Sequence, residues 1–471
     1  SDGTSPLYMN ALGTMVNDWG TCCTSSNPTP DGGTANASEV YLRFGTSSPL
    51  LLGGISNSIG GTEHFIGAIN DTNFFNKVTV IATGNGEYFG VGGYLTFSSV
   101  ALNSVPAGSS VVDGSGLENP SAQPPAIPDI DTGSTYYTAA QLGASQVNPN
   151  FVGGTLQFNM DTFVGADFTV QSQGGTMDTE GNMVSVTGGF TGVGNMRKTG
   201  NGTLILSGTN TNQGGFTIEE GTLRASHDQN LGGGPLTIGN ATFQSGASMM
   251  SARQMIVEHS NSRLDVQDHD VEWQGGISGD GTLNVLGSGR LLLSGTNTYT
   301  GGTHIKGGSL LVTGDGALGT GALTIGNAAF VTGNDMSSTR QMILADTNST
   351  VDVYQGALTW GGEISGTGAL NFAGAGRLIL NGANSYTGGT NIMEGTLVGS
   401  TNSLQGQILN NGMIEFNQST DGTFDGALDG SGGLRKFGDG VLRIAGISRL
   451  GGNSYIEGGA LDVNGMFGTN L

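Results

Sequence analysis

Hydrophobic and polar residues alternate in many short runs along the C-terminal two-thirds of the chain. The run Thr-Leu-Ile-Leu at 203–206 is one of them, and Gly, Asn and Ser bound such runs on both sides. This pattern is typical of short strands that tight turns separate. No long segment has apolar residues at i, i+3, i+4 and i+7, the spacing of an amphipathic helix. The pattern therefore predicts an all-β chain.

One of these runs returns at a fixed interval. The segment Gly-Thr-Leu-Ile-Leu-Ser-Gly at 202–208 reappears in closely related form at 289–295 and again at 376–382, an offset of 87 residues both times. Other landmarks keep the same offset: 236–240 with 323–327, 253–256 with 340–343, and Trp273 with Trp360. Self-similarity at a fixed period indicates a repeat architecture. Short strands in such an array predict a parallel β-helix, a solenoid in which each coil contacts only its neighbours.

The repeat is too long for one coil, so it must be divided. Four coils of about 22 residues fit, which predicts 14 or 15 coils over some 315 residues and a rod about 70 Å long. A fourth, degenerate copy at 426–444 follows its counterparts by only 64 residues, as if one whole coil were missing. Corresponding residues would then lie four coils apart on one face. On this division, Tyr299 and Tyr386 should be widely separated features of the surface or an edge.

Strand periodicity sorts the residues of the recurring segment into two faces. Leu204 and Leu206 and their counterparts in later copies are aliphatic, so we expect them to point inward. Arg443 occupies the position between them in the last copy, so that position should face outward. The turn that follows, Gly-Thr-Asn at 208–210 in the first copy, places Gly and Asn where we expect a left-handed φ.

The recurring motif resembles the autotransporter-associated β-strand repeat. The closest match is 291–310, with Tyr-Thr-Gly-Gly-Thr at 299–303; the copy at 378–397 is nearly as close, and the first copy departs by carrying Asn212 where later copies have Tyr. The resemblance covers roughly 136–471. It implies a right-handed parallel β-helix in a type V secreted passenger, at the surface of a Gram-negative bacterium or outside the cell. It also implies an outer-membrane β-barrel in the precursor.

The N-terminal part of the chain does not share the repeat. Residues 1–112 contain candidate strands at 40–44, 78–82 and 94–97, which predict a separate β domain or a cap for the solenoid. Residues 113–135 hold four prolines among Gly, Ser and Asp and are typical of a linker or strap. The predicted division is thus 1–112, 113–135 and 136–471.

Charge narrows the range of partners. The 37 acidic and 15 basic residues give a net charge of −22, which repels nucleic acid and disfavours anionic lipid. No apolar run reaches the roughly 20 residues of a transmembrane helix, so we expect no direct insertion of this chain into a membrane. No cleavable signal peptide is present either, and we expect Ser1 to mark a mature or trimmed start.

Two groups of residues are candidates for site chemistry. Alternation along 268–272 would place Asp268, Asp270 and Glu272 on one outer face, a candidate site for Ca²⁺; the alternative is a solvated acidic face without a cation. The adjacent Cys22 and Cys23 are candidates for a vicinal disulfide, with a pair of unreactive thiols, an inter-chain crosslink or a soft-metal site as alternatives. We expect no other cofactor.

Three functions follow. The first is a surface-exposed structural or adhesive passenger, a stalk or adhesin whose partner is a host or neighbouring-cell surface. The second is a self-assembling extracellular fibre or sheath subunit, whose partners are other copies of itself. The third is an enzyme with its active site in the N-terminal region. Because charged residues are sparse along the rod, the interpretation is a non-enzymatic protein.

Overall fold

The chain divides into two compact units, Ser1–Gln123 and Pro124–Leu471, in a computed structural model. The structure describes residues 129–132 and 148–463, together with the backbone of four strands of the first unit. These strands form one antiparallel sheet in the order β1-β4-β2-β3. Their bounds are β1 (Leu7–Met9), β2 (Ser38–Phe44), β3 (Leu50–Ile55) and β4 (Val78–Thr83). The strands predicted at 40–44 and 78–82 are confirmed, whereas 94–97 lies outside the described residues.

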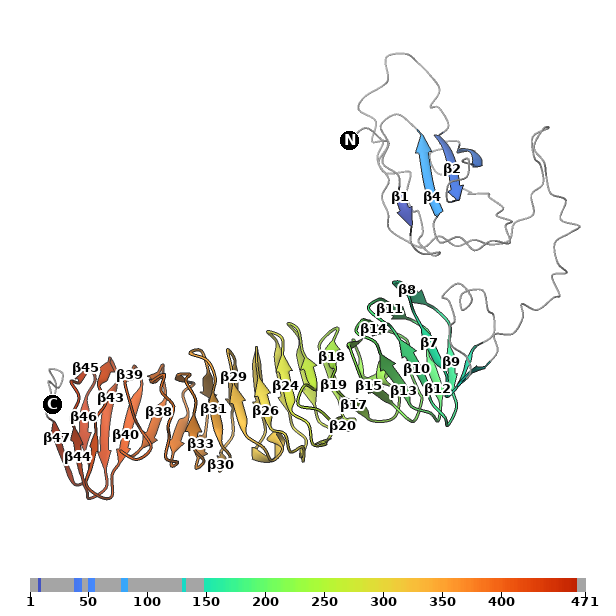
Figure 1. The fold of residues 1–471 in the computed structure, drawn as a ribbon. Helices are drawn as coiled ribbons and strands as arrows, with labels where there is room; N and C mark the ends of the chain where they lie inside the picture. Colours follow the sequence, from blue (N-terminus) through green and yellow to red (C-terminus); the bar gives the residue numbers. More distant parts are fainter. Residues whose placement is uncertain are drawn as a thin grey trace, which may run out of the picture. The chain divides into compact units, whose positions relative to one another are not determined.

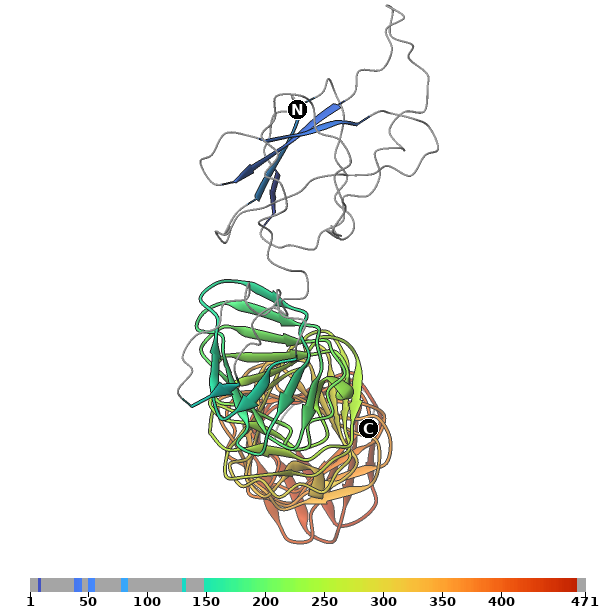
Figure 2. The ribbon, with the colours of Figure 1, turned by 90° about the vertical axis from the view of Figure 1, so that its right-hand side faces the viewer.

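The second unit is a parallel β-solenoid of about 16 turns (Figure 1). Its described part contains no α-helix, only the 3₁₀ turns η2 (Asp228–Leu231) and η3 (Asp315–Leu318). Viewed toward the end of the stack, the strands form a wall around one interior (Figure 2), and the buried hydrophobic side chains form one cluster there. The prediction of an all-β parallel solenoid is confirmed, with slightly more coils than the 14 or 15 expected.

Three faces make up the wall of the solenoid, and each is a ladder of parallel strands in two sections. The first face holds β5 (Ile130–Asp131), β6 (Asn150–Val152), β9 (Phe168–Val170) and β12 (Phe190–Gly192), then β19 (Met249–Ser251), β22 (Asp270–Trp273), β25 (Arg290–Leu293), β27 (Ser309–Val312), β29 (Ala329–Thr332), β32 (Thr350–Val353), β35 (Leu370–Ala373), β37 (Thr390–Ile392), β39 (Ile408–Asn410), β42 (Leu428–Gly430) and β45 (Arg449–Leu450).

The second face follows the first along each coil. It holds β7 (Thr155–Gln157), β10 (Gly175–Asp178), β13 (Met196–Thr199), β15 (Phe216–Ile218), β17 (Leu236–Ile238), β20 (Met255–Val257) and β23 (Ile277–Ser278), then β30 (Met336–Ser338), β33 (Ala357–Trp360), β36 (Arg377–Leu380), β38 (Thr396–Gly399), β40 (Met413–Asn417), β43 (Gly433–Phe437) and β46 (Ser454–Ile456).

The third face completes each coil. It holds β8 (Thr162–Val164), β11 (Met183–Val186), β14 (Thr203–Leu206), β16 (Thr222–Ala225), β18 (Thr242–Ser245), β21 (Arg263–Asp265), β24 (Leu283–Leu286), β26 (Thr303–Ile305), β28 (Leu323–Ile325), β31 (Met342–Leu344) and β34 (Ile364–Ser365), then β41 (Gly422–Phe424), β44 (Val441–Ile444) and β47 (Ala460–Val463).

The core is built from the inward positions of all three faces. Leu204 and Leu206 are almost completely buried, as are their counterparts in each later copy, and Arg443 is half exposed; the predicted inward and outward positions are confirmed. Aromatic rings also stack within the core. Phe151, Phe168 and Phe190 lie one above the other, and the centroids of neighbouring rings are 5.4 and 5.1 Å apart. Burial of this aliphatic and aromatic surface is the main force that holds the coils together.

The register of the strands corrects the predicted length of a coil. On the third face Thr203 pairs with Thr222 and, through Thr242 and Arg263, reaches Asn284 after four coils, so a coil takes about 20 residues rather than 22. An 87-residue repeat therefore covers four complete coils and continues to the next face of the following coil. Corresponding segments lie on successive faces: 203–206 on the third, 290–293 on the first and 377–380 on the second. The prediction that they share one face was wrong.

The shortened last copy obeys the same rule. From Arg377 the ladder climbs three coils through Thr396 and Met413 to Gly433, and the corresponding segment at 441–444 lies on the next face. The last spacing thus holds one coil fewer than the others and the same step of one face, so the prediction that one whole coil is missing is confirmed.

Glycine at 208 and its two counterparts serve a purpose other than the one predicted. None of Gly208, Gly295 and Gly382 has a left-handed φ, but a Cβ added to Gly208 would lie 2.2 Å from the carbonyl oxygen of Gly188. Only glycine lets the chain approach the coil below so closely. The left-handed φ occurs further along, at Gly221, Gly308 and Gly395, which have φ between 59° and 70°.

We expect the solenoid to tolerate loss of a complete coil but not of half a coil. Deletion of residues 350–370 joins Ser349 to Asn371, the residue that pairs with Thr350, so every ladder can close again. Deletion of 350–359 instead removes a first-face strand and most of a second-face strand, so the strands that follow meet ladders of other faces. The shorter chain should keep a β-type circular dichroism spectrum and a thermal unfolding midpoint within a few degrees of the parent. The half-coil deletion should lose the cooperative transition; equal behaviour of the two variants would contradict this register.

Candidate functional site

On each face, two successive coils have no strand, so the ladder of that face is interrupted. These interruptions, called gaps below, recur once in each copy of the repeat. On the first face the gap separates β12 from β19, on the second it separates β23 from β30, and on the third it separates β34 from β41. The first missing strand of each gap falls near residue 210, 297 or 384, so the gaps step from face to face as the repeat does. A missing strand leaves backbone N–H and C=O groups of the neighbouring coils to be satisfied by other means.

An asparagine side chain bridges each gap. Asn297 accepts a hydrogen bond through Oδ1 from the backbone N of Ile277, 2.7 Å away, and donates through Nδ2 to the carbonyl oxygen of Ala317, 2.6 Å away. Asn384 does the same between Ile364 and Ser403. Asn210 repeats the arrangement, and all three side chains are buried. Because a carboxamide has the donor and acceptor of a peptide group, it replaces the missing strand in the ladder.

The tyrosines beside these asparagines are buried, which overturns their predicted place at the surface or an edge. Tyr299 is completely buried and its hydroxyl lies 2.5 Å from Oγ1 of Thr303; Tyr386 is equivalent, 2.7 Å from Oγ1 of Thr390. Burial raises the pKa of Tyr386 to about 12. The ring fills the space that the absent strand leaves in the core. In the first copy the smaller Asn212 occupies this position and donates to the carbonyl oxygen of Gly215.

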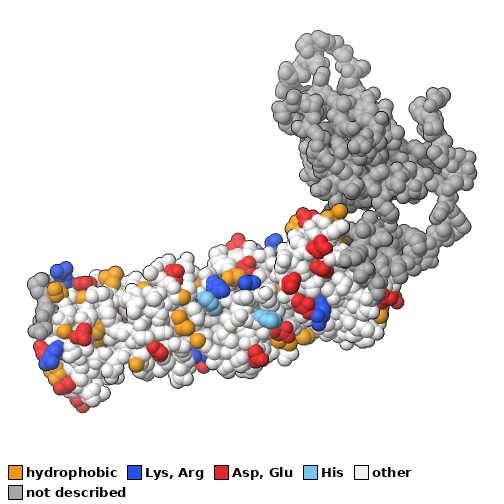
Figure 3. Space-filling model, viewed as in Figure 1, with side chains coloured by type: hydrophobic (Ala, Val, Ile, Leu, Met, Phe, Trp, Pro, Cys, Tyr) orange, Lys and Arg blue, Asp and Glu red, His pale blue; other side chains and the backbone are white. Residues whose placement is uncertain are grey.

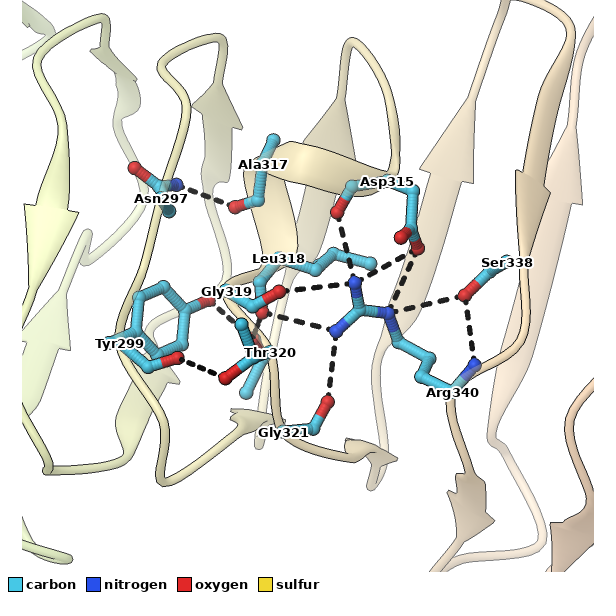
Figure 4. Close-up of polar contacts among 11 residues, drawn as sticks. Asn297, Tyr299, Asp315, Ala317, Leu318, Gly319, Thr320, Gly321, Ser338 and Arg340 are labelled. Atoms are coloured by element: carbon cyan, nitrogen blue, oxygen red, sulfur yellow. Dashed lines mark hydrogen bonds and ion pairs between the residues drawn. The ribbon is translucent and has the colours of Figure 1, made fainter.

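An arginine closes the gap in the first two copies (Figure 4). The guanidinium of Arg340 donates through Nη2 to the carbonyl oxygens of Asp315 and Gly319 and through Nη1 to that of Gly321, at 2.9 to 3.2 Å. It also pairs with the Asp315 carboxylate at 2.9 Å, and it is almost fully buried. Arg253 makes the same contacts around η2. The planar fork of arginine satisfies the carbonyls of a 3₁₀ turn that pairs with no strand.

Two buried lysines are residues that sequence reasoning missed. Lys198 donates through Nζ to the carbonyl oxygens of Thr199, Gly200 and Glu220, and Lys436 binds three carbonyls in the same way near the other end of the solenoid. Both occupy one repeat position, which holds Val285 and Phe372 in the middle copies. The sequence signal is a lysine two residues before a Gly-x-Gly turn in an otherwise apolar inward column.

The three acidic residues proposed for Ca²⁺ do not converge. Asp270 pairs with Arg290 at 3.2 Å, Glu272 accepts from Gln274 at 2.7 Å, and Asp268 lies beside His269. Within the part of the chain that the structure describes, no three His, Cys, Asp or Glu side chains meet as metal ligands would. Binding of Ca²⁺ there remains a prediction. Cys22 and Cys23 lie outside the described residues, as do the side chains of the N-terminal region to which the enzyme hypothesis assigned an active site.

The described surface of the solenoid is mostly polar, with exposed hydrophobic side chains such as Phe163 and Ile447 between the polar ones. On the face shown in Figure 3, acidic and basic side chains are scattered among uncharged ones along the described coils. Neither of the 3₁₀ turns, nor any other described helical segment, approaches the length and apolarity that a membrane crossing demands. The polar groups that bridge the gaps lie inside the solenoid, whereas the outward positions differ from copy to copy.

Comparison with known proteins identifies the same repeat. A family model described as the passenger-associated-transport-repeat matches residues 196–225, 283–312 and 373–398. Each match contains one bridging asparagine and the strands on either side of it. The adhesin BmaC autotransporter of Brucella suis biovar 1 (strain 1330) is 29% identical over an alignment of 375 residues, and the match covers 72% of this chain. The chain spans about a tenth of the length of that relative, since the match covers 10% of it. No solved structure matches.

Replacement of Asn297 by alanine should destabilise the solenoid. The change leaves the backbone N of Ile277 and the carbonyl of Ala317 buried without partners, at a cost of about 1–3 kcal/mol for each group. Urea unfolding followed by circular dichroism should show a lower midpoint than the parent. The exposed neighbour Thr296, changed to alanine, is the control and should move the free energy of unfolding by no more than about 0.5 kcal/mol. Equal effects would mean that Asn297 does not bridge the ladder.

Stability should rise with pH through the titration of Lys198. Burial lowers the pKa of Lys198 to about 8 from 10.5, so between those values the unfolded chain holds a proton that the folded chain has released. In that window the parent should gain up to about 3 kcal/mol relative to Lys198→Met, which has no such group. Below pH 8 the difference between the two should be constant. Urea midpoints measured from pH 7 to 10.5 check this, and parallel pH profiles would refute it.

Proposed function

This stretch of chain is an autotransporter passenger region, and we propose that it acts as an adhesive stalk at the surface of a Gram-negative bacterium. Such a passenger lies at the cell surface or outside the cell. The observation that carries the proposal is the placement of one transport repeat on three successive faces of a single continuous core. The name of the Brucella relative, an adhesin, supports the adhesive part of the proposal.

The described solenoid is stabilised by hydrogen bonds and hydrophobic packing within its own interior. Asparagine and arginine side chains bind the backbone groups that the gaps leave unpaired, and lysine side chains bind the carbonyls of turns. The hydrophobic core is one cluster that runs from coil to coil. A stack of this kind presents a long surface whose outward positions tolerate change. One such position holds Thr203, Arg290, Arg377 and Val441 in the four copies. This independence supports a structural and adhesive role over a catalytic one.

The alternative of a self-assembling fibre or sheath subunit gains no support from the described coils. A non-enzymatic role is likewise part of the proposal, since the polar groups gathered within these coils already serve the ladder.

Adhesion can be measured with the whole chain. Beads coated with the 471-residue protein should bind to cultured epithelial cells in greater number than beads coated with albumin, and soluble chain should compete. Beads coated with chain that has been heat-denatured before coating control for non-specific attraction by its negative charge. Binding no greater than that of albumin-coated or denatured-chain beads would refute the adhesive part of the proposal.

A further inference from the structure

Four asparagines of the solenoid stand in the sequence Asn-x-Ser/Thr, which accepts N-linked sugars in exported proteins. Within the described residues this sequence occurs at 201–203 (Asn-Gly-Thr), 240–242 (Asn-Ala-Thr), 348–350 (Asn-Ser-Thr) and 417–419 (Asn-Gln-Ser). Asn201, Asn240, Asn348 and Asn417 are called the acceptor asparagines below. A motif of three residues also recurs by chance, so the place of each side chain in the fold decides whether it can carry a sugar.

All four acceptor asparagines are exposed, and all lie where a strand begins or ends. Asn201, Asn240 and Asn348 are in the turns that lead into β14, β18 and β32, and the threonine of each motif is the first residue of that strand. These three threonines occupy outward positions, because the residue that follows each of them is buried. Asn417 is the last residue of β40, and its motif ends on an exposed serine. Each motif thus presents its amide and its hydroxyl outside the wall.

The side-chain amides of the acceptor asparagines take no part in the hydrogen bonding of the solenoid. Other asparagines do: Asn297 and Asn384 bridge gaps, and Asn182 and Asn195 donate through Nδ2 to backbone carbonyl oxygens at 2.8 and 2.9 Å. Within the described coils no hydrogen bond engages the side chain of an acceptor asparagine. A sugar on Nδ2 would break the bonds that Asn297 makes, whereas on an acceptor asparagine it leaves the ladder intact.

The repeat itself shows that the fold does not require this motif. Asn327 lies in the turn of the second copy that corresponds to Asn240, and Asn261 lies in the turn of the first copy that corresponds to Asn348; both are exposed. The third position of the motif holds alanine after Asn327 and arginine after Asn261. The turn is therefore kept while the hydroxyl is present in one copy and absent in the other.

We propose that the four acceptor asparagines are sites of N-linked glycosylation by a transferase that uses a nucleotide-activated sugar. In this transfer Nδ2 of the asparagine forms a bond to the anomeric carbon of the sugar. The bond between that carbon and the phosphate oxygen of the donor breaks, the nucleoside diphosphate leaves with the bonding electrons, and one amide proton passes to a basic group of the transferase. The modification goes beyond the proposed adhesive function and does not depend on it.

The spacing of the sites along the wall leaves room for the sugars. Thr203 pairs with Thr222 and Thr222 with Thr242, so the motifs at 201–203 and 240–242 share one corner and lie two coils, about 10 Å, apart. The coil between them has glycine at the corner, Gly221. Neighbouring sugars would therefore cover the corner without displacing each other.

The first test uses the passenger isolated from the bacterium that produces it. Peptide mass spectrometry should find a sugar on the peptides that carry the acceptor asparagines and none on Asn261 or Asn327. Unmodified acceptor asparagines in this material would overturn the proposal. Neither result bears on adhesion, so the proposed function stands or falls separately in the bead experiment.

A second test asks whether the folded chain is a substrate and whether the motif selects the sites. The whole recombinant chain is incubated with a soluble bacterial N-glycosyltransferase and UDP-glucose, and the peptides are mapped by mass spectrometry. Thr242→Ala should abolish modification of Asn240 and leave the other three sites unchanged. Ala329→Thr completes the motif of the second copy and should make Asn327 an acceptor. Both changes are at outward positions, so both variants should keep the circular dichroism spectrum of the parent.

Two results of the second test would contradict the structural argument. A free peptide of residues 236–246 that is modified while the folded chain is not would show that the fold hides the motif. Equal modification of Asn240 in the parent and in Thr242→Ala would show that exposure alone, and not the motif, selects the site.

Discussion

The parallel hydrogen-bond ladder is the constraint on which the rest of this solenoid depends. Every coil must bring its strands back into register above those below, and side chains alternate between core and solvent with a period of two. Insertion or loss is therefore confined to whole coils or to the turns between strands, where the length of a coil varies by a few residues. The last repeat illustrates this, because it is shorter than the others by one coil and still advances by one face.

Interrupting the ladder is costly unless every freed backbone group finds a partner. This chain interrupts each face in turn and meets the cost with three side chains of different geometry. The carboxamides of Asn210, Asn297 and Asn384 imitate a peptide group, the guanidinium of Arg253 or Arg340 gathers the carbonyls of a 3₁₀ turn, and a tyrosine or asparagine fills the vacated core. Because the gaps rotate around the axis, successive gaps fall on different faces.

Because inward residues stabilise the solenoid, outward residues are available for binding other molecules. Outward residues can change without disturbing the ladder, so a binding point can be added at a corner by altering few residues.

The amino-acid sequence alone determined the all-β class, the 87-residue period, and the inward position of Leu204 and its counterparts, because periodicity two and self-similarity are properties of the chain itself. It could not determine how many residues close a coil, since a repeat of 87 is compatible with several divisions. Only the register of paired strands showed coils of about 20 residues and the rotation of the motif from face to face. The same holds for Tyr299 and Lys198. Their burial and partners depend on the coil above or below, about 20 residues away, and a missing strand in a neighbouring coil leaves no mark on the local pattern.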